Sequence, residues 1–366
     1  MIPFHTTDRQ HRALLPELEA ALTGVGVIDD ARPKDVIAEF EDKLALYCGS
    51  RYAVATGSGT DALTMALMAL DLPAGSEVIT GAFGFFATAL AIIRAGHVPV
   101  FVDTTHDGFL LDPGVVISAI TSRTAAIVPV HLYGEAANLT ALRTIADRHG
   151  CVIVEDAAQA LGARWEDRPV GTVGAAGIFS FNWSKHLSGR TNGGAAVTDD
   201  PKVAERITSL RRYGAEQGFT HTTLGFNSTL NPYEAAILGV KLPHLDRWIA
   251  RRATIADRYA RQLAGVDGLR IPAPGPAGGH AFHKFTIRAA DRDGLRAHLK
   301  AAGITAMIFY PGLLHEQPAL DRAEFRVAKL VHAPGLPGEV LSLPIYPELT
   351  DAEVDRICAE IVAFHA

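Results

Sequence analysis

Lys185 is the residue with the clearest potential for covalent chemistry. An apolar, strand-like run from Gly177 to Phe181 leads into a loop of Ser, Asn and Gly residues, where aromatic and small side chains flank this lysine. Desolvation disfavours the ammonium form of a lysine and lowers its pKa, and a neutral amine can form a Schiff base with a carbonyl. A solvated loop lysine is the alternative, so the interpretation depends on other residues of the chain.

A turn rich in glycine is suited to bind an anion. Gly57-Ser58-Gly59-Thr60 lies between an apolar run that ends at Thr56 and a helical pattern over residues 62–70. Unpaired amides and the positive end of a helix macrodipole favour a phosphate there, although an ordinary N-cap by Ser58 or Thr60 is the alternative. The turn lacks the lysine of the GxxxxGK[ST] loop. We therefore predict a phosphate site, and the turn does not establish a nucleotide site.

A carboxylate and a group of aromatic residues could hold the rest of a flat ligand. Asp156 follows an apolar run over residues 152–154, which predicts a buried central strand. A carboxylate there is costly unless a cation or several donors meet it, so it either caps a following helix or faces a ligand's protonated ring nitrogen. Three phenylalanines around Gly84 belong to the core or provide a platform for a ring. The histidines lack metal-ligand spacing, so we expect no metal site.

These residues follow the strands of a predicted sheet. Short apolar runs alternate with helical patterns, which predicts a mainly parallel sheet with helices on both faces. In such sheets ligands bind beyond the carboxyl ends of the strands, where the candidate residues lie. The predicted strands cover residues 52–56, 77–80, 98–103, 125–132, 152–156 and 177–181.

The length of 366 residues predicts two domains. A long helix is expected from about residue 233 to 263, with a kink at Pro243, and a Gly- and Pro-rich stretch over 265–279 follows it. We predict a large domain over residues 1–245, which includes N-terminal helices, and a small α+β domain over 246–366. The elements expected after the stretch are a strand at 282–288, a helix at 291–302, strands at 306–310 and 341–343, and a helix from Thr350.

Composition excludes several classes of function. A net charge of −6 without a Lys/Arg-rich run argues against nucleic-acid and anionic-membrane partners. The three cysteines lie far apart without CxxC pairing, as reduced core thiols do. The first ten residues lack a basic region followed by an apolar segment, and no apolar run is long enough to span a bilayer. We expect a cytoplasmic protein.

Several motifs, in this order, resemble those of the DegT/DnrJ/EryC1/StrS aminotransferases. The resemblance covers nearly the whole chain and implies an α/β, aspartate aminotransferase-like fold of type I, with a mainly parallel mixed sheet between helices in the large domain. It also implies pyridoxal 5′-phosphate (PLP) as cofactor, which alternates with pyridoxamine phosphate (PMP) while an amino group moves from an amino acid, with glutamate expected, to a keto sugar. The matching segments are Ser58 to Leu63, Glu155 to Ala163, Phe179-Ser180-Phe181 with Lys185, Gly193-Gly194-Ala195, Gly225-Phe226-Asn227 and Leu341 to Pro344.

The resemblance implies roles for individual residues. Lys185 matches the Schiff-base lysine, which also carries a proton, and Asp156 matches the partner of the pyridine nitrogen. Asn227 matches an asparagine lent to the phosphate by the neighbouring subunit, which implies a homodimer with shared active sites. The remaining implied cofactor contacts are Gln159 at the phenolic oxygen, Phe85 on the ring, and Gly59, Thr60, Asp61 and Ser180 at the phosphate.

The substrate is less well defined by the same resemblance. Asn227-Ser228-Thr229-Leu230 lacks an arginine that the family often has, and with Val240 to Asp246 it is most similar to members that aminate C3 of a dTDP-linked 3-keto-6-deoxy sugar. Such enzymes serve secondary-metabolite or cell-surface sugar biosynthesis. The loop from Asp29 to Pro33 and the segment from Tyr310 to Pro318 are expected substrate walls, with Tyr310 and His315 as candidate contacts.

Three alternatives remain open at this point. The acceptor could be a cyclitol ketone or a 4-keto nucleotide sugar, either of which needs the same amino-transfer chemistry. A non-catalytic regulator that keeps the fold is the third alternative. The presence of Lys185, Asp156 and Gln159 argues against such a regulator.

Overall fold

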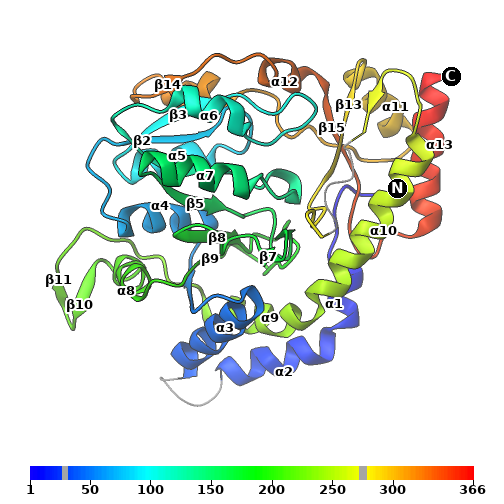
Figure 1. Cartoon of the computed structure of the whole chain (residues 1–366). Coiled ribbons are helices and arrows are strands. Elements are labelled where there is room, and N and C mark those ends of the chain that lie inside the picture. Colours follow the sequence, from blue (N-terminus) through cyan, green and yellow to red (C-terminus); the bar gives the residue numbers. More distant parts are fainter. Residues whose placement is uncertain (27–31, 272–277) are drawn as a thin grey trace.

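A large eight-stranded sheet organises the computed structural model, which describes residues 1–26, 32–271 and 278–366 (Figure 1). Among the described strands of this sheet, only β9 runs antiparallel to its neighbours β1 and β8, and all other adjacent strands are parallel. The mixed, mainly parallel sheet expected from the sequence is therefore present. Its strands, in spatial order, are β1 (Tyr52–Thr56), β9 (Gly194–Thr198), β8 (Ala176–Ser180), β5 (Val152–Asp156), β4 (Thr124–Val128), β2 (Glu77–Gly81), β3 (Val98–Val102) and β14 (Arg326–Val327).

The six predicted strands are confirmed, but one was predicted too long. β4 ends at Val128, whereas the apolar run continues to Leu132. Pro129 cannot donate to a strand ladder, and Tyr133 adopts a φ of 60°, so the chain turns away from the sheet. β9 and β14 were not predicted, because β9 consists of Gly, Ala, Val and Thr without clear alternation and β14 has two residues.

Helices cover both faces of the large sheet. Successive residues of a strand point to opposite faces, and Ile178 packs on one side while Phe179 packs on the other. α4 (Gly59–Ala69), α5 (Ala87–Arg94) and α8 (Pro201–Leu210) bury apolar side chains on the first face. The second face is covered by α6 (Pro113–Ala119) and α7 (Leu139–His149), and by α2 (Leu15–Gly26), α3 (Arg32–Cys48) and α9 (Pro232–Lys241).

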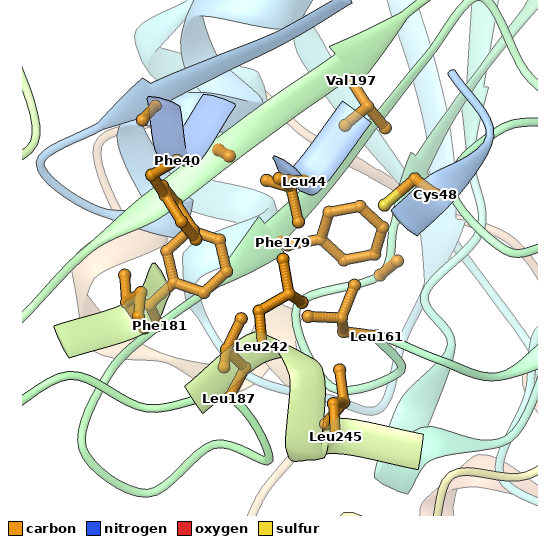
Figure 2. Packing of buried hydrophobic residues seen from close by; sticks show 14 of the residues in the cluster. Phe40, Leu44, Cys48, Leu161, Phe179, Phe181, Leu187, Val197, Leu242 and Leu245 are labelled. Atoms are coloured by element: carbon orange, nitrogen blue, oxygen red, sulfur yellow. The ribbon is translucent and has the colours of Figure 1, made fainter. Parts of the chain in front are cut away.

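The core under α3 and α9 supports the strand that leads to Lys185. Phe181 packs edge-on against Phe40 of α3, with ring centroids 5.4 Å apart. Figure 2 shows this cluster, in which side chains of two strands meet those of the helices. The carboxyl end of β8 is thereby fixed in a dense apolar core. The residues labelled there are Phe40, Leu44, Cys48, Leu161, Phe179, Phe181, Leu187, Val197, Leu242 and Leu245.

The predicted long helix is confirmed together with its kink. It consists of α9, a 3₁₀ turn over Leu242–His244 that contains Pro243, and α10 (Leu245–Leu263). α10 runs from the large sheet to a second, smaller sheet (Figure 1).

Several short elements lie outside both sheets. The short helix α1 (Asp8–Ala13) precedes α2. Two small hairpins are formed by β6 and β7 (Arg164–Trp165, Arg168–Pro169) and by β10 and β11 (Ala215–Gln217, Thr220–His221).

The second sheet has its own hydrophobic core. Its strands, in order, are β12 (Leu269–Arg270), β13 (Phe285–Ala289) and β15 (Val340–Leu343), all antiparallel, and α10, α11 (Arg292–Ala301) and α13 (Asp351–His365) pack on it. The short α12 (Leu336–Glu339) precedes β15. The N-terminus joins this core, because Ile2 is buried in it and pairs with Ile304. The division at residue 245 into two domains stays a prediction.

One predicted strand in this region is wrong. Residues 306–310 form only an isolated bridge, between Met307 and Ser342. The segment leaves the sheet because Phe309 and Tyr310 turn into the lining of a cavity. Within the described residues, no helix is both long and apolar enough to cross a membrane.

Candidate active site

A cavity of about 480 Å³ lies at the carboxyl ends of β5 and β8. Its wall combines residues of the large sheet, the N-terminal segment and the chain around the small sheet. Asp61, Asn227 and His315 do not line it. The predicted site residues that the structure brings together here are Gly59, Thr60, Phe85, Asp156, Gln159, Ser180, Lys185 and Tyr310.

The amine of Lys185 lies in the wall of this cavity. A turn follows β8, and the backbone N–H of Lys185 donates to the carbonyl of Asn182 at 2.8 Å. Burial lowers the pKa of Lys185 from 10.5 to about 8, while the charge of Asp156 acts in the opposite direction. A substantial fraction of this amine is therefore neutral near physiological pH, as a nucleophile requires.

Asp156 is held by two donors at the end of β5. Its Oδ2 accepts from Thr88 Oγ1 at 2.7 Å, and its Oδ1 accepts from the backbone N–H of Ala158 at 3.2 Å. The alternative in which Asp156 caps a helix is wrong, because a turn follows β5. The side chain is buried and belongs to the cavity lining, so it can face a cationic group of a ligand.

Thr88 is a site residue that the sequence did not reveal. It is buried in the first part of α5, and the residues that surround it there are alanine, leucine and isoleucine. A hydroxyl on a buried helix face needs a partner, so this isolated polar residue was the available signal. Its partner Asp156 lies 68 positions later in the chain, a pairing that periodicity does not predict.

The turn before α4 is both an N-cap and an open anion site. Ser58 caps the helix, with its Oγ accepting from the N–H of Asp61 at 3.1 Å. The amides of Gly59 and Thr60 lie in the first turn, where a helix offers no carbonyl partner, and both residues line the cavity. The two alternatives for this turn are therefore compatible.

Glycines let the backbone approach closely at this turn. A Cβ added at Gly59 would lie 2.9 Å from Cβ of Ser180, and one added at Gly194 would lie 2.4 Å from the nitrogen of Gly59. Only glycine fits either position without displacing the backbone. β8, β9 and α4 thus form a tight cradle of amides and a hydroxyl, groups that can donate to a phosphate.

Asp61 and Asn227 lie behind this cradle rather than in the cavity wall. The carboxylate of Asp61 accepts from Ser228 Oγ at 2.8 Å and lies 3.7 Å from the guanidinium of Arg94. The backbone carbonyl of Ser228 also accepts a hydrogen bond from the N–H of Gly57 at 2.9 Å. Asn227 is exposed beside it. The side chain of Asp61 therefore anchors the loop that carries Asn227.

Gln159 connects three parts of the site. Its Oε1 accepts from the backbone N–H of Tyr133 at 2.9 Å, and its Nε2 donates to Tyr310 Oη at 3.2 Å. Tyr310 in turn lies beside Phe85, with ring centroids 5.8 Å apart. These contacts make an aromatic and amide wall next to Lys185.

The two candidate substrate contacts lie in different places. Tyr310 lines the cavity, whereas His315 packs its ring against Phe101 at a centroid distance of 6.2 Å and is absent from the lining. Residues 29–31 of the expected substrate wall lie outside the described residues. Within the described ranges, no group of three or more His, Cys, Asp and Glu side chains could hold a metal ion.

The DegT/DnrJ/EryC1/StrS aminotransferase family model matches residues 29–362. The chain belongs to this family. It is 41% identical, over 97% of its length and 94% of the relative's, to a dTDP-3-amino-3,4,6-trideoxy-alpha-D-glucose transaminase of Streptomyces venezuelae. Among solved structures, it is similar to S. venezuelae DesV, with 40% identity, a TM-score of 0.93 and coverage of 100% and 98% of the two chains.

This aminotransferase is PLP-dependent and has the aspartate aminotransferase-like fold of type I. A structure of NtdA from Bacillus subtilis with bound PMP is 30% identical, with a TM-score of 0.88 and coverage of 99% and 85%. The cavity fits this cofactor, because backbone amides at the start of α4, a buried carboxylate and an amine of lowered pKa line it together.

Proposed function

We propose that this aminotransferase moves an amino group from glutamate to a nucleotide-linked keto sugar, a dTDP-linked 3-keto-6-deoxyhexose. The convergence of Lys185, Asp156 and the cradle at Gly59 in one cavity carries the amino-transfer part of the proposal. Similarity over nearly the full length to a transaminase named for a dTDP-3-amino sugar supports the acceptor. The product class places the enzyme in deoxyamino sugar biosynthesis, as found in antibiotic pathways.

Asp156 and Thr88 would act together on the cofactor ring. PLP, when bound, supplies an electron sink for cleavage of a bond to the substrate's reacting carbon. A buried carboxylate keeps a proton on the pyridine nitrogen, since the ion pair favours the charged form. The hydroxyl of Thr88 orients this carboxylate through its 2.7 Å hydrogen bond.

Lys185 would first attach the cofactor covalently and then move a proton. Its lowered pKa provides the neutral amine needed for attachment. Once freed, the same amine would hold the proton that moves between the reacting carbon and the cofactor's C4′ atom. Gln159, held by Tyr133 and Tyr310, would donate a hydrogen bond to the phenolic oxygen of the cofactor.

The cradle would hold the cofactor's phosphate. The amides of Gly59 and Thr60 and the hydroxyl of Ser180 would be its donors within one chain, whereas the N–H of Asp61 already donates to Ser58 Oγ. A dianion at the N-terminus of α4 is favoured by the helix macrodipole.

The proposal includes a homodimer with two shared active sites. Asn227 is exposed, while the neighbouring Ser228 fixes its loop to Asp61, so the asparagine is available to a second subunit's phosphate. Phe85 and Trp183 are each 56% exposed although both line the cavity, as expected of side chains that a second subunit covers.

The free, buried cysteines favour a reducing compartment, so we also propose a cytoplasmic location.

A panel of ketones tests the proposed acceptor. The PMP form of the enzyme is mixed with dTDP-3-keto-6-deoxyglucose, its 4-keto isomer and a cyclitol ketone, and products are identified by mass spectrometry and NMR. We expect an amine at C3 of the dTDP sugar and the return of PLP absorbance. Amination of the cyclitol ketone or the 4-keto sugar alone would contradict the acceptor and leave the amino-transfer chemistry intact.

A further inference from the structure

Lys284 is a second buried lysine in the wall of the same cavity. It directly precedes β13, and its backbone N–H donates to the carbonyl of Tyr133 at 3.1 Å. Its side chain is directed between two aromatic rings of the cavity lining, with Nζ 3.9 Å from the ring centroid of Phe309 and 5.2 Å from that of Phe4. Only 6% of the residue is exposed.

The ammonium group of Lys284 lacks an anionic partner within the described part of the chain. No carboxylate there lies within 4 Å of Nζ, and Nζ donates no hydrogen bond to a described residue. Aromatic faces stabilise a cation, but they do not replace the hydrogen bonds that its three N–H donors can make. A buried, unpaired charge is unfavourable, and burial together with Lys185 and Arg252 lowers the pKa of Lys284 well below its usual value.

An anionic substrate group would supply the missing partner. The cofactor's phosphate has its own cradle at the start of α4, made of other residues. Lys284 comes instead from the chain beside the small sheet, and it lines the same cavity as Lys185, whose charge acts on it. An anion bound to Lys284 therefore lies near the amine at which amino transfer occurs.

The depth of Lys284 distinguishes between the anions of the two substrates. The diphosphate of a nucleotide-linked sugar bears a nucleoside, so it must extend out of the buried part of the cavity, whereas Lys284 is only 6% exposed. The α-carboxylate of an amino acid is bonded directly to the reacting carbon. It consequently has to be bound at depth, where Lys284 is.

We infer that Lys284 binds the α-carboxylate of the amino-acid donor and thereby selects α-amino acids in the first half-reaction. Phe4 and Phe309 fix the direction of the ammonium group, and the carboxylate completes its hydrogen bonds. The inference rests on the proposed function for the identity of the donor, and it adds a recognition residue that acts before the keto sugar binds.

The test separates the two half-reactions of the holoenzyme. Glutamate is titrated against the PLP form of wild type and of Lys284→Met, and conversion to the PMP form is followed by absorbance. We expect the apparent dissociation constant for glutamate to rise on the order of tenfold to a hundredfold in Lys284→Met, the range for loss of a hydrogen-bonded charge pair. Lys300→Met, which removes an exposed lysine of α11, should match wild type.

A comparison of donors identifies the carboxylate that is bound. Wild type should prefer glutamate to its α-amide, and Lys284→Met should lose most of this preference. The same comparison with Lys284→Gln keeps the test valid if the methionine variant does not fold. Unchanged glutamate affinity and donor preference in both variants would overturn the inference, as would an effect confined to the reaction of the PMP form with the keto sugar.

Failure of the proposed acceptor would give a different pattern. In that case wild type aminates none of the dTDP sugars, yet glutamate still converts its PLP form. The effect of Lys284→Met on that conversion then decides the role of Lys284 independently.

Discussion

Burial and the charge of Asp156 act in opposite directions on the amine of Lys185. Burial is the larger effect, so the pKa falls from 10.5 to about 8. Protonation governs reactivity, because only the neutral amine attacks a carbonyl. The neutral fraction of a group with this pKa grows about tenfold per pH unit below pH 8 and is nearly complete above pH 9.

The rate at which cofactor-free protein captures PLP should follow this titration. We expect the rate to rise about tenfold per pH unit from pH 6 to 7 and to level off just above pH 8, measured by the absorbance of bound cofactor. Since Asp156 raises the pKa of Lys185, Asp156→Asn should move the midpoint to lower pH. A rate that keeps rising to pH 10 would show an ordinary, solvated lysine instead.

Asp156→Ala should retain the cofactor and lose turnover. Without the carboxylate, the ring nitrogen loses its favoured proton and the electron sink weakens. We expect covalently bound PLP at near-normal occupancy and a fall in the transamination rate of roughly two to four orders of magnitude, a range typical of lost proton control. Asp257→Ala, on the exposed side of α10, is the control. Turnover within a few-fold of wild type would refute the role of Asp156.

Sequence motifs indicated the residues proposed to carry chemistry better than those that position them. Lys185, Asp156 and Gln159 stand in short motifs beside strand ends, and the structure brings all three to one cavity. Thr88 and Lys284 belong to ordinary helix and strand patterns, so only contacts between distant segments reveal them. Conversely, His315 stood in an expected substrate wall and packs on Phe101 instead.

The contact between β9 and the first turn of α4 determines the shape of the proposed phosphate cradle. A Cβ at Gly194 would lie 2.4 Å from both the nitrogen of Gly59 and the carbonyl carbon of Ser58. These backbone atoms belong to the capped first turn of α4. Removing the steric clash would therefore require β9 or α4 to move.

Gly194→Ala should therefore weaken cofactor binding. We expect a loss of about 1–3 kcal/mol in the free energy of unfolding, typical of overpacking, and a PLP dissociation constant at least about tenfold higher. Gly24→Ala is the matched control, because a Cβ there meets no atom within 4 Å. Fluorescence titration with PLP and urea unfolding measure both quantities. Equal affinities for the two variants would contradict the cradle.

The elements of the large sheet were predictable where apolar runs are flanked by turn residues. β9 was missed because small residues at 194–196 are needed for the close approach to α4, and small residues give a weak strand pattern. The segment over residues 306–310 was predicted as a strand from its apolar residues. Met307, Phe309 and Tyr310 line the cavity, while Ala306 and Ile308 pack on the core of the small sheet, and the pattern alone does not distinguish these surroundings from burial in a strand.

The complete active site extends beyond one chain in the proposed homodimer. Asn227 does not line the cavity that holds Lys185 of its own chain, whereas its loop is anchored to the turn before α4 through Ser228 and Asp61. Each site would then combine Lys185 of one subunit with Asn227 of the other. Sequence alone could suggest this only through the family resemblance, since no pattern within a chain reports a contact between copies.

Mixing two inactive variants tests the shared sites. Lys185→Ala lacks the amine and Asn227→Ala lacks the phosphate contact, but a mixed dimer contains one site with both residues intact. After subunit exchange of equal amounts, about half of the dimers are mixed and half of their sites are complete, so we expect about a quarter of wild-type activity. Activity that stays at the sum of the separate variants would argue against sharing between subunits.

Two lysines, Lys185 and Lys284, line one cavity, and we propose covalent attachment of the cofactor to only the first. The most direct measurement is borohydride reduction of the PLP-loaded enzyme, followed by peptide mass spectrometry. We predict that the phosphopyridoxyl mass is found on the peptide that contains Lys185 and that Lys185→Ala yields no such adduct. A label on Lys284 in wild type, or unchanged labelling of Lys185→Ala, would contradict the account.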